Sequence, residues 1–150
     1  MSDQRHATTV AIARFARDSG VRVALLLEAD GRVIAQHGFT RRVDVTSASA
    51  LAAAIQSSTR ELGRFLDDRT LGPIHHDGDE CQLFLAPIPE DHPARLMLAV
   101  FDRATSLGLV RVFWEDLAAS LKRQAPPRPP TPETFERDLQ QSLSTLFGGG

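Results

Sequence analysis

Apolar and polar residues recur along the chain with two different periods, and these periods predict its helices and strands. Between residues 8 and 19 apolar residues recur at helical spacing, and Gly20 follows where the end of a helix favours glycine. Two strand-like runs, 21–28 and 32–37, flank Asp30-Gly31, a dipeptide typical of tight hairpin turns. The N-terminal part of the chain therefore predicts a helix followed by a β-hairpin.

A long helix is predicted from Asp44 to Leu66, because this stretch contains no proline and is rich in alanine. Asp44, Thr46 or Ser47 could cap its beginning. Its larger apolar residues recur at helical spacing and form one stripe: Leu51, Ile55, Leu62 and Phe65.

Three further strands and one more helix are predicted in the second half of the domain. Residues 74–76 and 81–88 flank an Asp77-Gly78 turn, which predicts a second hairpin. Residues 95–101 are apolar at both alternating sets of positions, as in a central strand that is covered on both faces. Behind a cap at Thr105 or Ser106, a stripe with spacings of three and four predicts a helix: Leu107, Val110, Trp114, Leu117 and Leu121. This order of elements indicates an α+β fold with helices on both faces of an antiparallel sheet.

Proline separates a C-terminal tail from the domain. Five of the eight residues from Ala125 to Pro132 are proline, which predicts a stiff extended linker. A helix is expected behind it, since Thr131 can act as a cap and proline suits the first helical position. We therefore divide the chain into a domain of residues 1–123, a linker of residues 124–131 and a tail helix of residues 132–150. The apolar residues of the tail fall on one stripe: Phe135, Leu139, Leu143, Leu146 and Phe147.

Composition narrows the class of protein. The chain has 150 residues, 42% of them hydrophobic, which suits one domain with a core. Its formal net charge of −2 gives no electrostatic reason to expect a nucleic acid or an anionic membrane as partner. It has a single cysteine, and neither a secretory signal nor an apolar run of membrane-spanning length is recognisable. We therefore expect a cytoplasmic protein that binds neither nucleic acid nor membrane.

One segment, His75 to Cys81, carries residues that could bind a metal or catalyse a reaction. Its imidazoles, carboxylates and thiol are possible metal ligands, and Cys81 could be a nucleophile if His75 or His76 served as its base. Adjacent histidines on a strand, however, point to opposite faces, and Asp-Gly forms a hairpin turn without a metal. The chain also lacks a glycine-rich loop followed by Lys and Ser or Thr, the phosphate cradle of nucleotide hydrolases. We expect no enzyme activity, no catalytic or metal-binding residue and no cofactor; an enzyme that uses this segment is the least favoured alternative.

Two segments of the chain resemble a known family. Residues 20–35 are similar to the opening hairpin of roadblock/dynein-light-chain domains, and residues 101–111 are similar to the beginning of their final helix. The likeness covers about residues 5 to 123 and is strongest to the bacterial MglB type, which also carries a C-terminal extension. It implies a three-layer sandwich in which a five-stranded antiparallel sheet has helices on both faces. The implied order is helix-strand-strand-helix-strand-strand-strand-helix.

A surface of small residues on the 44–66 helix could let a second helix approach closely. Roadblock domains usually dimerise through this helix and the neighbouring edge strand, so the resemblance implies a homodimer. The residues expected at the dimer interface are Ala50, Leu51, Ala53, Ala54, Ser57 and Ser58. The alternative is that the small residues only pack on the helix's own sheet.

The resemblance also implies a function. It predicts a non-catalytic homodimer that binds a small Ras-like GTPase of the MglA type, as an activator or other modulator of its nucleotide cycle, in bacterial polarity or motility. The apolar stripe of the tail could bind this partner as a helix in a groove, or fold back onto its own domain or its dimer mate. The alternative function is a dimeric scaffold or light-chain-like adaptor without GTPase regulation. The sequence leaves open the identity of the partner and the direction of the effect.

Overall fold

The helices and strands follow one another in the predicted order. The computed structural model describes residues 2–38, 44–67, 71–89, 94–124, 137 and 139–143. The elements are α1 (Ser2–Ser19), β1 (Val23–Leu27), β2 (Val33–Gly38), α2 (Val45–Phe65), β3 (Ile74–Asp77), β4 (Gln82–Pro87), β5 (Leu96–Phe101) and α3 (Leu107–Gln124). Among the described residues no helix combines the length and apolarity that crossing a membrane would require.

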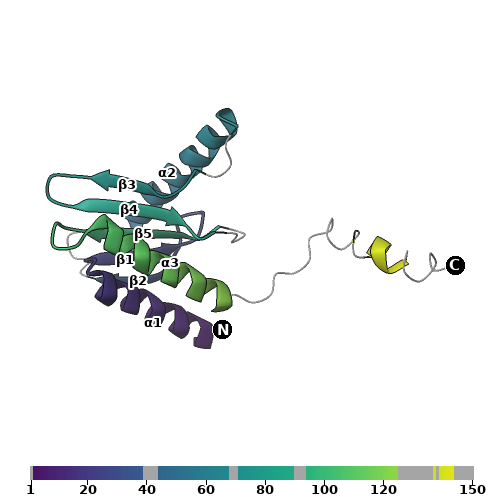
Figure 1. Cartoon of the computed structure of the whole chain (residues 1–150), viewed down its shortest axis with the longest axis horizontal. Helices are drawn as coiled ribbons and strands as arrows, with labels where there is room; N and C mark the ends of the chain where they lie inside the picture. The colour runs from purple at the N-terminus through teal and green to yellow at the C-terminus, as the bar shows by residue number, and fades with distance from the viewer. Residues whose placement is uncertain are drawn as a thin grey trace.

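The five strands form one antiparallel sheet in the order β2-β1-β5-β4-β3. Helices α1 and α3 lie beside each other on one face, and α2 covers the other face, which gives three layers (Figure 1). Strand β5 is the central strand, and its side chains are buried on both faces apart from the half-buried Val100. The predicted three-layer α+β sandwich is thus confirmed.

The larger of two apolar cores lies between the sheet and the pair α1 and α3. From α3 the predicted stripe points inward, with Val110, Trp114, Leu117 and Leu121 buried. The ring of Trp114 meets that of Phe84 edge-on, with 6.2 Å between centroids. The apolar spacing of α3 in the sequence therefore correctly identified its buried face.

The second core lies between the sheet and α2, and apart from the half-buried Val45 the helix contributes small or polar side chains to it. The buried residues of this helix are Ser49, Ala52, Ala53, Gln56 and Gly63. Opposite them stand the large side chains of the sheet: Val23, Leu25, Leu27, Leu85, Leu96 and Leu98. Small side chains on the helix let its axis come close to the sheet, and the larger apolar residues of α2 point away from it.

Two details differ from the sequence expectations. Helix α1 begins at Ser2 rather than at residue 8, because its first turns are polar and give no apolar period, although Asp3 suits the positive end of the helix dipole. The second turn lies at residues 79–80 rather than at Asp77-Gly78, because Asp77 pairs with Gln82 and the N–H of Gly78 donates to the carbonyl of Cys81 at 3.0 Å. In the first hairpin the N–H of Glu28 donates to the carbonyl of Arg32 at 2.8 Å, which encloses the three residues that the predicted strands leave between them.

Of the two candidate caps before α3, Ser106 performs the role. Its Oγ accepts a hydrogen bond from the N–H of Leu109 at 3.2 Å. Thr105 instead donates its hydroxyl to the carbonyl of Ser19 at 2.6 Å, a buried bond between residues 86 positions apart. This bond joins the end of α1 to the segment that leads into α3, and so helps to fix the two helices side by side.

Candidate functional site

The His75 to Cys81 segment forms an exposed hairpin, with β3 leading into the loop. The Nε2 of His75 lies 2.9 Å from Oε1 of Gln82, its neighbour across the strands. Cys81 is exposed in the loop, where its backbone carbonyl accepts from the N–H of Gly78 at 3.0 Å. Within the described ranges, no group of three or more His, Cys, Asp or Glu side chains is placed to hold a metal ion. The segment thus has the contacts of an ordinary turn.

The most conspicuous surface of the domain is the outward side of α2. Leu51 is 65% exposed and Phe65 is 92% exposed, and Ile55 and Leu62 are also exposed. Together with Ala54 and Ser58 they define what we call the α2 outer face, in which a shallow hollow is lined by Leu51, Ala54, Ile55, Ser58, Thr59 and Leu62. An exposed apolar row of this length is uncommon on a monomeric protein and is typical of an interaction surface.

Two features mark the N-terminal part of α2: a capping aspartate and the close approach of the first hairpin loop. Asp44 caps the helix, and its Oδ1 accepts from the N–H groups of Thr46 and Ser47 at 3.1 and 3.3 Å. The hydroxyl of Ser47 donates to Oδ2 at 2.7 Å and is the main cause that lowers the pKa of Asp44 below its ordinary value, followed by the backbone N–H of Ser47. Gly31 has a φ of +93° that favours glycine, and a Cβ added there would lie 3.4 Å from the Cα of Ala50.

The residues expected at a dimer interface are divided between the two sides of α2. Leu51, Ala54 and Ser58 lie on the outer face, and Ala50 and Ser57 are exposed at its flank. Ala53 is buried on the side that faces the sheet. The expected set omitted Ile55, Leu62 and Phe65, although their spacing was visible in the sequence, because a large apolar stripe normally faces a helix's own core.

Strand β3 is an edge of the sheet next to this helix. Of the described strands it pairs only with β4, so the outward backbone groups of its four residues are open to a further strand. Ile74 of β3 packs with the core that contains Ala52 of α2. The side chain of Ile74 therefore lies on the face of the sheet that α2 covers, so this open strand edge borders the layer formed by α2.

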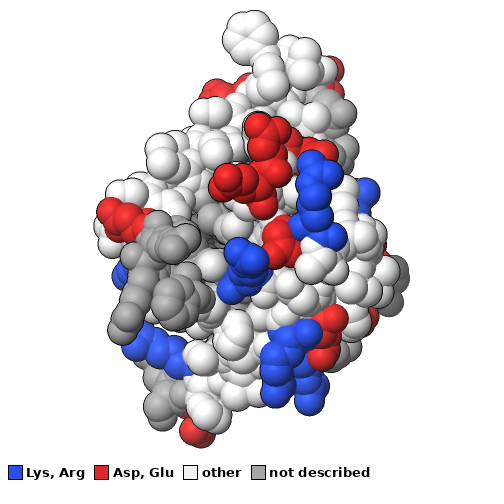
Figure 2. Space-filling model, turned by 90° about the vertical axis from the view of Figure 1, so that its left-hand side faces the viewer, with Lys and Arg blue, Asp and Glu red and all other residues white. Residues whose placement is uncertain are grey.

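Charged side chains form no surface of one sign on the face shown in Figure 2, where acidic and basic groups are intermixed. Arg22 and Asp102 form an ion pair at 2.7 Å. Such a mixed surface offers nothing comparable to the apolar row of α2 as a recognition feature.

Only part of the predicted tail stripe falls within the described residues. Residues 139–143 are helical, and Leu139 and Leu143 are both exposed. Phe135, Leu146 and Phe147 lie outside the described residues.

Comparison with known proteins agrees with the fold. The profile of the roadblock/LC7 domain family matches residues 9–101. Among solved structures, MglB of Myxococcus xanthus is 23% identical with a TM-score of 0.72, over 77% of this chain and 92% of that chain. The gliding protein MglB of Thermus thermophilus is 22% identical with a TM-score of 0.72, over 81% of this chain and 90% of that one.

A more distant likeness has the same overall architecture. Profilin IA of Acanthamoeba castellanii is 13% identical with a TM-score of 0.55, over 77% of this chain and 97% of that chain. Comparison with curated proteins found no match. Identities below 25% establish a shared fold and leave partners open, whereas the family profile spans more than half of the 150 residues. This chain therefore belongs to the roadblock/LC7 domain family.

Proposed function

We propose that the protein forms a homodimer through the α2 outer face and the edge strand β3, and that the dimer binds a small Ras-like GTPase and modulates its nucleotide cycle. The observation that carries this proposal is the α2 outer face, on which Leu51, Ile55, Leu62 and Phe65 are left exposed by the domain's own fold.

A second copy of the chain is a suitable cover for this face. Around a two-fold axis the same patch meets itself, so an apolar row on one subunit is automatically opposed by an apolar row on the other. The open edge of β3 could pair with its own symmetry mate in an antiparallel manner and extend the sheet across two subunits. The small residues at the centre and flank of the outer face, Ala54, Ser57 and Ser58, would permit close approach of the two helices.

The GTPase is proposed as partner because the chain is a roadblock domain whose sequence resembles the MglB type. The dimer would present a composite surface that a single chain lacks. Since we expect no hydrolytic group in the chain, its effect must come from binding energy that favours one arrangement of the GTPase's own switch residues. A binding partner can shift such an equilibrium only by its difference in affinity for the two states. The proposal therefore requires that the affinities for the GTP and GDP forms differ.

The tail could provide a second contact with the same GTPase. A tethered helix with the stripe Phe135, Leu139 and Leu143 would bind at an effective concentration set by its linker, which raises the overall affinity. The polarity or motility role of the system is part of the same proposal and follows from the resemblance.

The test is a binding experiment with the small Ras-like GTPases encoded in the same genome. The immobilised full-length chain should retain one of these GTPases in one nucleotide state and not equally in the other, and should change its rate of GTP hydrolysis or exchange. The variant Leu51→Asp should lose this binding, while Leu109→Asp, at an exposed leucine of α3, should keep it. Absent or nucleotide-independent binding would refute the proposal.

An adaptor without GTPase regulation is the second candidate, and the exposure of Leu139 and Leu143 favours it. Deletion of residues 125–150 separates the two functions. GTPase binding by the domain should survive this deletion, although more weakly, whereas recruitment of a partner through the tail should be abolished.

A further inference from the structure

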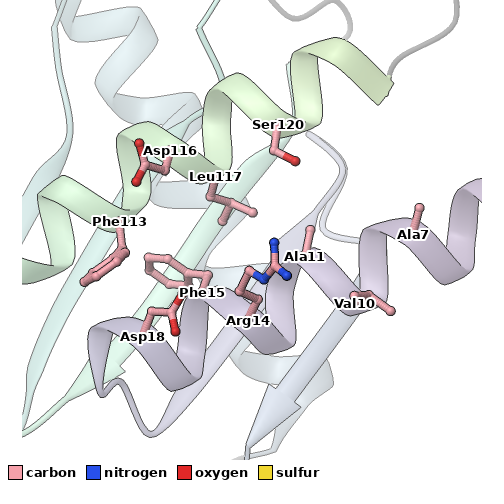
Figure 3. A pocket seen from close by; sticks show the side chains of 10 residues that line it. All are labelled: Ala7, Val10, Ala11, Arg14, Phe15, Asp18, Phe113, Asp116, Leu117 and Ser120. Carbon is pink, nitrogen blue, oxygen red and sulfur yellow. The ribbon is translucent and has the colours of Figure 1, made fainter.

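A second depression lies on the opposite face of the domain, between α1 and α3 (Figure 3). It has a volume of about 480 Å³, and its lining combines the apolar side chains of Val10, Ala11, Phe15, Phe113 and Leu117 with polar ones, Arg14, Asp18, Asp116 and Ser120. Val10 is 48% exposed, which is high for a valine beside a core. We call this depression the α1–α3 groove. It lies across the sheet from α2, so the proposed dimer interface would leave it open.

We propose that the α1–α3 groove is the docking site of the chain's own C-terminal tail, which binds there as a helix through its apolar stripe. The first argument is position. Helix α3 ends at Gln124, and Ser120, one turn earlier, already lines the groove. The tail therefore starts at one end of the groove, and its effective concentration there is high.

The second argument is length. The α1 residues that line the groove extend from Ala7 to Asp18, about 16 Å along a helix axis at 1.5 Å per residue. As a helix, the stripe from Phe135 to Phe147 would span about 18 Å. An extended linker of residues 124–131 reaches roughly 25 Å at 3.1 Å per residue. This exceeds the distance of about 16 Å from Gln124 back to Phe113, so the tail can reach either end of the groove.

The third argument is charge. Arg14 extends from α1 toward α3 (Figure 3) and is the only basic residue of the lining, which also contains the acidic Asp18 and Asp116; Arg14 forms no ion pair within the described structure. In the tail, Glu136 follows Phe135 directly and would lie about 100° around a helix from it, at the border of the stripe. A docked tail can thus place the carboxylate of Glu136 at the guanidinium of Arg14 while Leu139 and Leu143 cover the apolar lining.

If the tail docks in the groove, its apolar stripe can contact either the groove or a partner, but not both at once. A partner that binds the stripe must first displace it from the groove, so the groove would lower the apparent affinity of any tail-binding partner. Variants that empty the groove should therefore strengthen such binding.

The test is disulfide formation in the full chain, in a Cys81→Ser background that removes its only cysteine. One variant carries Val10→Cys and Leu139→Cys. The matched control carries Val112→Cys and Leu139→Cys, because Val112 is 56% exposed on α3 but does not line the groove. Under a glutathione redox buffer we expect the groove pair to form an intramolecular disulfide at least tenfold faster than the control pair. Circular dichroism checks that both variants are folded.

Each other outcome has a defined meaning. Equal rates for the two pairs would overturn the proposal in favour of a separate partner as occupant. Formation of disulfide-linked dimers alone would overturn it in favour of a second copy. Arg14→Glu should slow the groove disulfide, and adding Glu136→Arg should restore its rate. Absence of both effects would contradict the assigned contact between these two residues. The experiment contains no GTPase, so its result is independent of the proposed function.

Discussion

Replacing Leu51 by alanine tests whether the α2 outer face holds two subunits together. Burial of a whole leucine side chain stabilises by about 1.5–3 kcal/mol relative to exposure, and Leu51 is 65% exposed in the single chain. A dimer that covers it would therefore gain about 1–2 kcal/mol from each copy. Because a two-fold axis places the residue in the interface twice, the loss on substitution is about 2–4 kcal/mol per dimer. This corresponds to a rise in the dimer Kd of roughly 30- to 1000-fold.

Sedimentation velocity over a concentration series measures this Kd directly. Leu109→Ala is the control, since it removes the same atoms from an exposed leucine on α3, and it should leave the Kd unchanged. Because Leu51 is largely exposed within its own domain, the monomeric variant should retain the far-ultraviolet circular dichroism of the wild type. A wild-type chain that is monomeric at high concentration, or a Leu51→Ala variant with the wild-type Kd, would refute this assignment.

Three further predictions concern the fold that positions this face. Thr105→Val removes a buried hydrogen bond to Ser19 and should lower the free energy of unfolding by about 1–3 kcal/mol in urea titration; an unchanged midpoint would contradict the role of this bond. Asp44 has a lowered pKa in the folded chain, so its contribution to stability is present above the ordinary aspartate pKa and lost as the pH falls through its folded value; the difference between wild type and Asp44→Asn should shrink as the pH falls below the ordinary aspartate pKa, and a difference that does not change with pH would exclude a charge effect. Gly38→Ala would bring Cβ to 2.0 Å from the carbonyl oxygen of Arg22 at a φ of +115° and should lower the Tm strongly, whereas Gly72→Ala, which meets nothing within 4 Å, should not.

Periodicity in the sequence was sufficient for those elements whose large apolar residues face the core. The stripe of α3 and the two-sided burial of β5 were both predicted, because in these two elements the large apolar residues are the ones that are buried. The beginning of α1 was missed because Ser2 to Ala7 carries helix-compatible polar residues and no apolar period. The position of the second turn was also missed, since an Asp-Gly pair indicates a turn while the strand register decides which residues it encloses.

Helix α2 shows why a pattern of apolar residues does not reveal what covers them. One side of this helix carries small residues around Ala52 and faces the sheet. The other side carries large apolar residues around Leu51 and faces outward. The spacing of apolar residues reveals both sides but does not show which of them faces the sheet. Close packing of a helix on a sheet favours small residues, whereas interfaces between subunits favour large ones. The buried bond between Thr105 and Ser19 lies beyond any local pattern, because its partners are 86 residues apart.

The central claim is that a dimer formed through the α2 outer face recognises a GTPase in a nucleotide-dependent way. Calorimetric titration of a small Ras-like GTPase from the same genome, loaded in turn with GDP and with a non-hydrolysable GTP analogue, measures this most directly. The account predicts affinities that differ by at least tenfold between the two nucleotide states, equivalent to about 1.4 kcal/mol, and loss of binding in Leu51→Asp but not in Leu109→Asp. Equal affinities for both states, or binding that survives in Leu51→Asp, would contradict it.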